Sequence, residues 1–124
     1  MESRSLRVLV VEDSADTAEA LGEAIEMAGH QVELALSGAE ALKKAQVLRP
    51  EVVFLDIGLP GMSGFEVARH LRESQESAGA YIVALTGYGN AADRDGTAKA
   101  GFDRHMVKPI SLEALEEALA QSRR

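Results

Sequence analysis

The chain has 124 residues, of which 46% are hydrophobic and 27% are charged, with a net charge of −7 and no cysteine. This length predicts one domain, residues 1–124, large enough to bury a core, and the lack of cysteine excludes disulfides and thiolate metal sites. The acidic balance argues against direct binding of nucleic acid, and the lack of a signal-peptide pattern and of an apolar run of about 18 residues indicates a cytoplasmic domain without membrane contact.

The first predicted elements are a strand, a helix and a second strand. LRVLVV (6–11) is a nearly continuous apolar run, which is typical of a strand buried on both faces. Apolar residues at helical spacing follow, with Ser14 as N-cap and Gly29 as the residue that closes the helix. QVELAL (31–36) alternates apolar and polar residues, which suits an edge strand.

The middle of the chain repeats this alternation. Ser37 and Glu40 have the spacing of a capping box, which predicts a helix over Ala39–Val47. EVVFL (51–55) predicts a second strand buried on both faces. A third helical pattern begins at Phe65.

The last third of the chain adds two strands and two helices. YIVAL (81–85) predicts a buried strand, and DRHMVK (103–108) alternates as an edge strand would. Between them, the small and polar residues around Ala91–Ala100 predict a weakly held fourth helix. A fifth helix is expected from Leu112, with Ser111 as its N-cap.

Strand and helix alternate five times, which is the pattern of an α/β domain with helices on both faces of a parallel sheet. Right-handed crossovers and the length favour a doubly wound, flavodoxin-like sheet of five strands in the order 2-1-3-4-5, with five helices. In such sheets ligands bind at the carboxyl ends of the strands, near the switch in strand order.

The predicted strands end on residues that could carry chemistry: Glu12 and Asp13 after the first, Asp56 after the third, Thr86 after the fourth and Lys108 after the fifth. Carboxylates that lie close together repel one another unless a cation binds, and a site with oxygen ligands alone suits Mg²⁺ or Mn²⁺. An aspartate can be a phosphoryl acceptor, while a lysine and a hydroxyl hold phosphoryl oxygens. This set predicts a Mg²⁺-dependent phosphoryl acceptor with Asp56 as the nucleophile.

Other interpretations stay open for each of these residues taken singly. An acidic pair is often a solvated turn, a threonine a cap, and a lysine a surface residue. GYGNAA (87–92) matches a dinucleotide-binding loop, although it follows the fourth strand rather than the first. The glycines Gly58, Gly61 and Gly64 could form a phosphate cradle or, more simply, a tight turn that presents a backbone carbonyl to the metal.

The stretches VLVVEDS, VVFLDIGLPGMSG, ALTG and MVKP, in this order, resemble the receiver domain of bacterial two-component response regulators over essentially the whole chain. Three stretches are most similar in sequence to receivers of hybrid sensor histidine kinases: LDIGLPGMSGFEVA, ALTGYG and AGFDRHMVKP. The resemblance implies that Asp56 is the phosphoacceptor and that Glu12, Asp13 and the Gly58 carbonyl join it in binding Mg²⁺. It also implies that Thr86 and Lys108 contact the phosphoryl group and that the bond before Pro109 is cis.

The resemblance further implies a partner and an output. The phosphoryl group would come from a phosphohistidine on a sensor histidine kinase or a histidine phosphotransfer protein, within a phosphorelay. The domain would assist its own phosphorylation and dephosphorylation, and is not expected to be a metabolic enzyme. Phosphorylation would change the face of the fourth helix, fifth strand and fifth helix, through which a homodimer could form.

Four positions bear on the switch and on phosphoryl lifetime. His105 stands where the family often has an aromatic residue that turns inward on activation, so Thr86 and His105 are the expected switch residues. Gly58 and Tyr88 occupy positions that help to set the rate of dephosphorylation in the family. The competing functions are an Asp-nucleophile phosphohydrolase, a flavin-binding module and an unphosphorylated scaffold.

Overall fold

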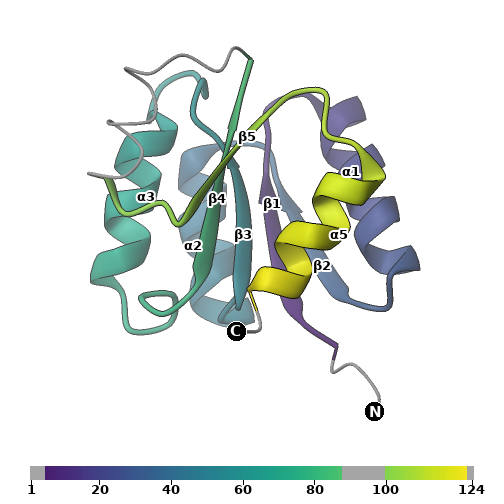
Figure 1. The fold of residues 1–124 in the computed structure, drawn as a ribbon. Coiled ribbons are helices and arrows are strands. Elements are labelled where there is room, and N and C mark those ends of the chain that lie inside the picture. The colour runs from purple at the N-terminus through teal and green to yellow at the C-terminus, as the bar shows by residue number, and fades with distance from the viewer. Residues whose placement is uncertain (1–4, 88–99, 123–124) are drawn as a thin grey trace.

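The computed structural model describes residues 5–87 and 100–122, and it places the five strands in one parallel sheet of order β2-β1-β3-β4-β5 (Figure 1). This is the predicted doubly wound order. The strands are β1 (Arg7–Val11), β2 (Gln31–Ala35), β3 (Val52–Asp56), β4 (Tyr81–Thr86) and β5 (Arg104–Val107). The third strand was expected over 51–55 and lies one residue later, so that Asp56 is its last residue.

Helices cover both faces of the sheet, with α1 and α5 on one side and α2 and α3 on the other (Figure 1). They span α1 (Ala15–Met27), α2 (Gly38–Leu48), α3 (Gly64–Glu73) and α5 (Leu112–Gln121). Almost all of the predicted fourth helix, around Ala91–Ala100, lies outside the described residues. Ala100 is its only described residue. In the described part of the chain no helix is long and apolar enough to cross a membrane.

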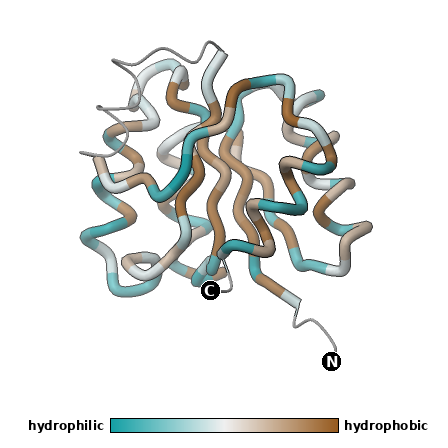
Figure 2. The backbone as a smooth tube through the Cα atoms, in the orientation of Figure 1, coloured by the Kyte–Doolittle hydropathy of each residue, from teal (hydrophilic) through white to brown (hydrophobic). Residues whose placement is uncertain are grey.

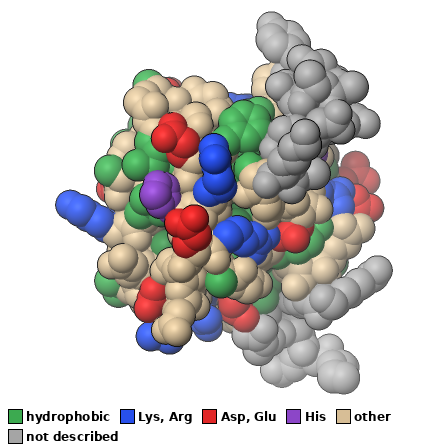
Figure 3. All heavy atoms as spheres, turned by 90° about the vertical axis from the view of Figure 1, so that its left-hand side faces the viewer, with side chains coloured by type: hydrophobic (Ala, Val, Ile, Leu, Met, Phe, Trp, Pro, Cys, Tyr) green, Lys and Arg blue, Asp and Glu red, His purple; other side chains and the backbone are tan. Residues whose placement is uncertain are grey.

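Apolar side chains form one core on each side of the sheet, and the hydrophobic strands run between them (Figure 2). Every residue of β3 is buried, whereas β5 has one buried residue, Met106. The edge positions predicted for the alternating strands are therefore confirmed. On the face that Figure 3 shows, acidic and basic side chains are interspersed.

Serine caps begin the described helices. Each predicted cap accepts, through its hydroxyl oxygen, the backbone N–H of the residue three positions later. These caps are Ser14, Ser37 and Ser111. The capping box predicted for Ser37 is only half formed, because the Glu40 carboxylate accepts the N–H of Leu36 at 2.7 Å. The complete capping box lies instead at the start of α3, which begins one residue before the predicted Phe65.

The outer edge of β2 is protected by side chains from α2. Lys44 Nζ donates to the carbonyl of Leu34 at 2.6 Å and lies 3.4 Å from Glu40 Oε2. Glu40 in turn accepts the backbone N–H of Leu36. These bonds occupy polar groups that an exposed edge strand would otherwise offer to another chain.

Arg72 ties the end of α3 to the turn that follows it and to a segment that is distant in sequence. Its guanidinium donates to the carbonyls of Ala78, Ala80 and Gly101, at 2.6 to 2.9 Å, and to Asp103 Oδ2 at 2.7 Å. The same carboxylate oxygen accepts the backbone N–H of Ile82 at 2.8 Å. These hydrogen bonds hold the segment that enters β5 against the start of β4.

Candidate functional site

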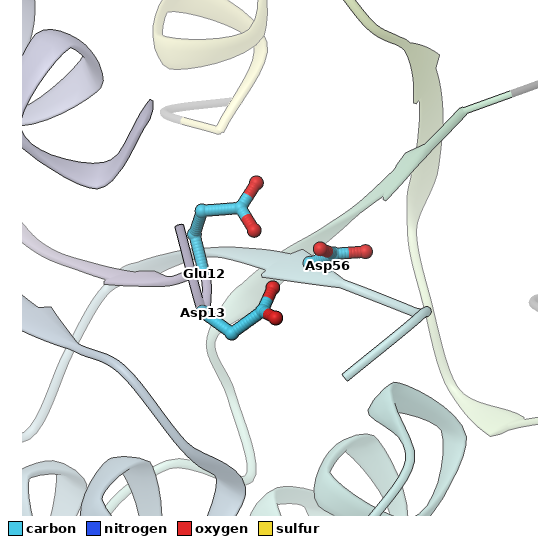
Figure 4. A group of neighbouring side chains, drawn as sticks. All are labelled: Glu12, Asp13 and Asp56. Atoms are coloured by element: carbon cyan, nitrogen blue, oxygen red, sulfur yellow. The ribbon is translucent and has the colours of Figure 1, made fainter. Parts of the chain in front are cut away.

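Three carboxylates meet at the carboxyl ends of β1 and β3 (Figure 4). The strands are parallel neighbours in which Val11 pairs with Leu55, so Glu12 and Asp13 emerge beside Asp56. One carboxylate oxygen from each residue lies within 4.8 Å of the others. Glu12 and Asp56 are buried, with 1% and 7% of their surface exposed, while Asp13 is exposed.

Lys108 brings a positive charge to these carboxylates from the other end of the sequence. Its Nζ donates to Glu12 Oε1 at 2.8 Å and to Asp56 Oδ2 at 3.1 Å. It follows β5 directly, and its backbone N–H donates to the Thr86 carbonyl at 2.8 Å. The Lys108–Pro109 peptide bond is cis, as the resemblance implied. The ammonium contacts two of the three carboxylates, so this group of described residues has a surplus of negative charge that suits a divalent cation.

The pKa values of the two buried carboxyl groups shift in opposite directions. Burial raises the pKa of Glu12, and its hydrogen bond with Asp56 raises it further. Burial would also raise the pKa of Asp56, but bonds with Glu12, the Gly58 N–H and Lys108 outweigh it and lower the pKa. Burial would lower the pKa of Lys108, yet the two carboxylates outweigh it and raise that pKa. Asp56 therefore stays ionised, as a nucleophile must, and Lys108 stays charged.

The loop after β3 fixes the orientation of Asp56. The Gly58 N–H donates to Asp56 Oδ1 at 2.8 Å, which leaves Oδ2 to Lys108. This bond involves the amide of Gly58, and the predicted role of its carbonyl as a metal ligand stays a prediction. The predicted turn is present, and Gly61 takes a φ of 77°.

Gly64 allows α3 to begin directly against the backbone of Asp56. A Cβ at this position would lie 2.5 Å from the Asp56 carbonyl oxygen and 2.5 Å from Ile57 Cα. No side chain fits there without movement of the backbone. The sequence pattern pointed to Gly64 as part of a turn but gave no sign of this contact, which joins residues on two different elements.

Thr86 and His105 lie on the two strands beyond β3. Thr86 ends β4 with 2% of its surface exposed, and its hydroxyl oxygen lies 3.0 Å from His105 Nε2 on β5. The structure thus joins Glu12, Asp13, Asp56 and Lys108 in one group and joins Thr86 to His105 in a second. Tyr88 lies outside the described residues.

Comparison with known proteins gives a consistent result. The model of the response regulator receiver domain family matches residues 8–120. Response regulator MprA of Mycobacterium ulcerans is 37% identical over 119 residues, which are 96% of this chain and 49% of that protein. The chain therefore spans about half the length of the curated relatives it matches.

Two solved structures extend the comparison. The chemotaxis protein CheY4 of Vibrio cholerae superposes with a TM-score of 0.91 at 30% identity, covering 96% of this chain and 99% of that one. A response regulator protein from Burkholderia pseudomallei, with a phosphorylated aspartic acid, a calcium ion and citrate, has a TM-score of 0.85 at 30% identity. That match covers 93% of this chain and 66% of the other.

Proposed function

The chain belongs to the response regulator receiver domain family, a family of phosphorylation-dependent switches in two-component signalling, and from this premise we propose that its phosphoacceptor is Asp56. The observation that carries the assignment is the contact of Asp56 Oδ2 with Lys108 at 3.1 Å, within a group of three carboxylates. The phosphorylated aspartic acid of the Burkholderia pseudomallei protein supports it.

The metal in this proposal is Mg²⁺, with Mn²⁺ as a chemically similar substitute. Glu12, Asp13 and Asp56 would hold it through carboxylate oxygens, with the Gly58 carbonyl as a further ligand. The donor set fits, because it offers oxygen atoms alone and more negative charge than Lys108 balances. When bound, Mg²⁺ supplies positive charge to the oxygens of the transferring phosphoryl group.

The chain's own residues then have distinct parts in the transfer. Asp56 Oδ attacks phosphorus in line, an O–P bond forms, and the N–P bond to the donor histidine breaks with its electron pair going to the imidazole. Lys108 turns from Asp56 to the phosphoryl oxygens and balances their charge. Thr86 donates its hydroxyl to the product. The same group would assist hydrolysis of the acyl phosphate, so the domain promotes its own modification without turning over a metabolite.

The donor is a phosphohistidine on a sensor histidine kinase or a histidine phosphotransfer protein. A groove of about 650 Å³ between α1 and α5 adjoins the site and is lined by Ala20, Ala24, Ile110 and Leu112, among others. Lys108 lines the same groove and also contacts Asp56. An apolar helix in this groove would carry its histidine close to the acceptor.

Other features of the proposal rest on resemblance alone. They are the specific similarity to receivers of hybrid kinases, the phosphorelay, and a homodimer through the fourth helix, fifth strand and fifth helix. A cytoplasmic location is proposed because kinase donors use ATP. The matched relatives are about twice as long as this chain, so the comparison leaves half of each relative unmatched. The comparisons therefore do not support the expectation that no nucleic acid is bound.

The rival functions fit the residues less well. A phosphohydrolase of the Asp-nucleophile kind would carry an acid two residues after the nucleophile, where this chain has Gly58. A flavin module would need a hydroxyl-rich phosphate loop after the first strand, where Glu12 and Asp13 stand. A pure scaffold has no need for a buried carboxylate pair that contacts a lysine.

The test is incubation with Mg²⁺ and a small acyl-phosphate donor, followed by intact mass measurement. Wild type should gain one phosphoryl group, and Asp56→Asn should gain none. A wild type without an adduct, or an adduct that persists in the Asn variant, would refute the assignment. Omission of Mg²⁺ and the Asp13→Asn variant test the metal in the same assay, and both should slow the reaction.

A further inference from the structure

His105 takes part in none of the proposed transfer steps, yet it makes a specific contact. It lies on β5 opposite Ala84 of β4, and its Nε2 lies 3.0 Å from the Thr86 hydroxyl oxygen. The resemblance implied an aromatic residue that acts by turning inward. An imidazole can instead hold Thr86 through a hydrogen bond, in which either partner can be the donor.

The surroundings of Thr86 indicate which partner donates. The side chain is buried, with 2% of its surface exposed, and its hydroxyl carries a single proton. Among the described residues, His105 Nε2 is its hydrogen-bond partner. If the ring donated, the hydroxyl proton would have no acceptor in the described part of the chain, which is costly for a buried group. Within the described residues, the arrangement that pairs the Thr86 hydroxyl proton has Thr86 donating to an unprotonated Nε2, with the ring proton on Nδ1.

The phosphoryl group on Asp56 would need the same proton. Asp56 pairs with Leu85, the neighbour of Thr86, in the parallel ladder of β3 and β4. Phosphoryl oxygens accept hydrogen bonds and donate none at neutral pH, except through a residual acidic proton. A hydroxyl with one proton cannot donate fully to both acceptors, so contact with the phosphoryl group requires loss of the bond to His105.

We propose that His105 acts as a latch: it accepts the Thr86 hydroxyl proton in the unphosphorylated state and competes with the phosphoryl group for it. His105 is thus a positioning residue that acts through Thr86 and opposes activation. The proposal rests on the function proposed above, because it requires phosphorylation at Asp56. A bound group shifts such an equilibrium only by its difference in affinity for the two arrangements, so a weaker latch means tighter binding of the phosphoryl group.

The experiment measures the affinity of the protein for beryllofluoride with Mg²⁺, a mimic of the phosphoryl group. His105→Phe removes the acceptor and should increase the affinity about 3- to 10-fold, the effect of one neutral hydrogen bond. His105→Leu should act in the same direction. In a Thr86→Val background, His105→Phe should leave the affinity unchanged, because the residue through which it acts is absent.

A second measurement needs no substitution and so does not depend on the folding of a variant. Nitrogen chemical shifts of the wild-type imidazole, recorded at about pH 8 where histidine is ordinarily neutral, should show His105 protonated on Nδ1. Addition of beryllofluoride with Mg²⁺ should shift the Nε2 resonance as its bond is lost. A ring protonated on Nε2 in the free protein would overturn the proposal.

The outcomes separate this proposal from the function on which it rests. If acyl phosphate modifies Asp56 but His105→Phe binds beryllofluoride as wild type does, the latch is refuted and the receiver function stands. An equal effect of His105→Phe with and without Thr86→Val also refutes it, because His105 then acts by another route. If no phosphoryl adduct forms on wild type, the proposed function itself fails.

Discussion

Replacement of Gly64 by alanine should both destabilise the fold and disturb the acceptor. The new Cβ would lie 2.5 Å from the Asp56 carbonyl oxygen and from Ile57 Cα, whereas ordinary contacts begin near 3.4 Å. Both neighbours are backbone atoms of the loop that leaves β3, so no side chain can rotate away. The start of α3 and this loop must therefore move apart by about 1 Å. Such a backbone shift is the usual response to an overpacked site.

The expected magnitude follows from two opposing contributions. Overpacking of this kind lowers the free energy of unfolding by about 1–3 kcal/mol. The better helix propensity of alanine offsets at most about 1 kcal/mol of this loss. The free energy of unfolding should fall by about 1–2 kcal/mol, or roughly 4–8 °C in Tm. Because the shift moves the carbonyl of Asp56 itself, phosphorylation by a small acyl phosphate should also slow, by about 10- to 100-fold.

Urea unfolding and the mass assay measure the two effects, and Gly79→Ala is the matched control. A Cβ at Gly79 would meet no heavy atom of the described residues within 4 Å, and Gly79 lies in the exposed turn before β4. The control should stay within about 0.5 kcal/mol of wild type. The reasoning is wrong if Gly64→Ala is as stable as the control, or if it unfolds more easily but accepts phosphoryl at the wild-type rate.

Three further predictions concern the site and its partner. Gly58→Asn should change the lifetime of the acyl phosphate without loss of folding, because among the described residues a Cβ there meets only Asp56 Oδ1, at 3.4 Å. An unchanged hydrolysis rate would contradict this. Burial raises the pKa of Glu12, so proton uptake by Glu12 stabilises the metal-free fold at low pH and this contribution is lost as pH rises. Mg²⁺ therefore competes with a proton at Glu12 as pH falls. Its affinity should therefore fall as pH falls from about 8 to 5, with proton release seen by calorimetry, and a constant affinity would refute the coupling. Ala20→Arg should block transfer from a phosphohistidine protein but not from a small acyl phosphate, and equal transfer from both would exclude the groove.

The arrangement of the sheet could be predicted because each strand carried its own signal. The continuous apolar runs became β1, β3 and β4, and the alternating runs became the edge strands β2 and β5. Strand order then placed Glu12, Asp13, Asp56 and Lys108 at one rim, and the structure brings these four together. Local patterns and general rules of topology were sufficient for this part of the site.

Contacts that depend on the distance between two elements could not be predicted. The bond between Thr86 and His105 depends on the register of β4 and β5, and the fit of Gly64 on how closely α3 approaches β3. At Ser37 the spacing was right, but Glu40 accepts the N–H of Leu36 because the preceding turn presents it. The capping box of α3 was overlooked, although Ser63 and Glu66 have the required spacing.

The burial of the strands has a mechanical consequence. Asp56, Thr86 and His105 lie on β3, β4 and β5 in that order, from the fully buried strand at the centre to the partly exposed strand at the edge. Close packing on both faces makes the acceptor strand stiff, whereas the edge strand, with Val107 44% exposed, yields at lower cost. A strain created at Asp56 by the proposed phosphorylation should therefore relax more readily toward the exposed edges of the sheet than within its centre. The route through β4 to β5 is the one of the two that carries Thr86 and His105.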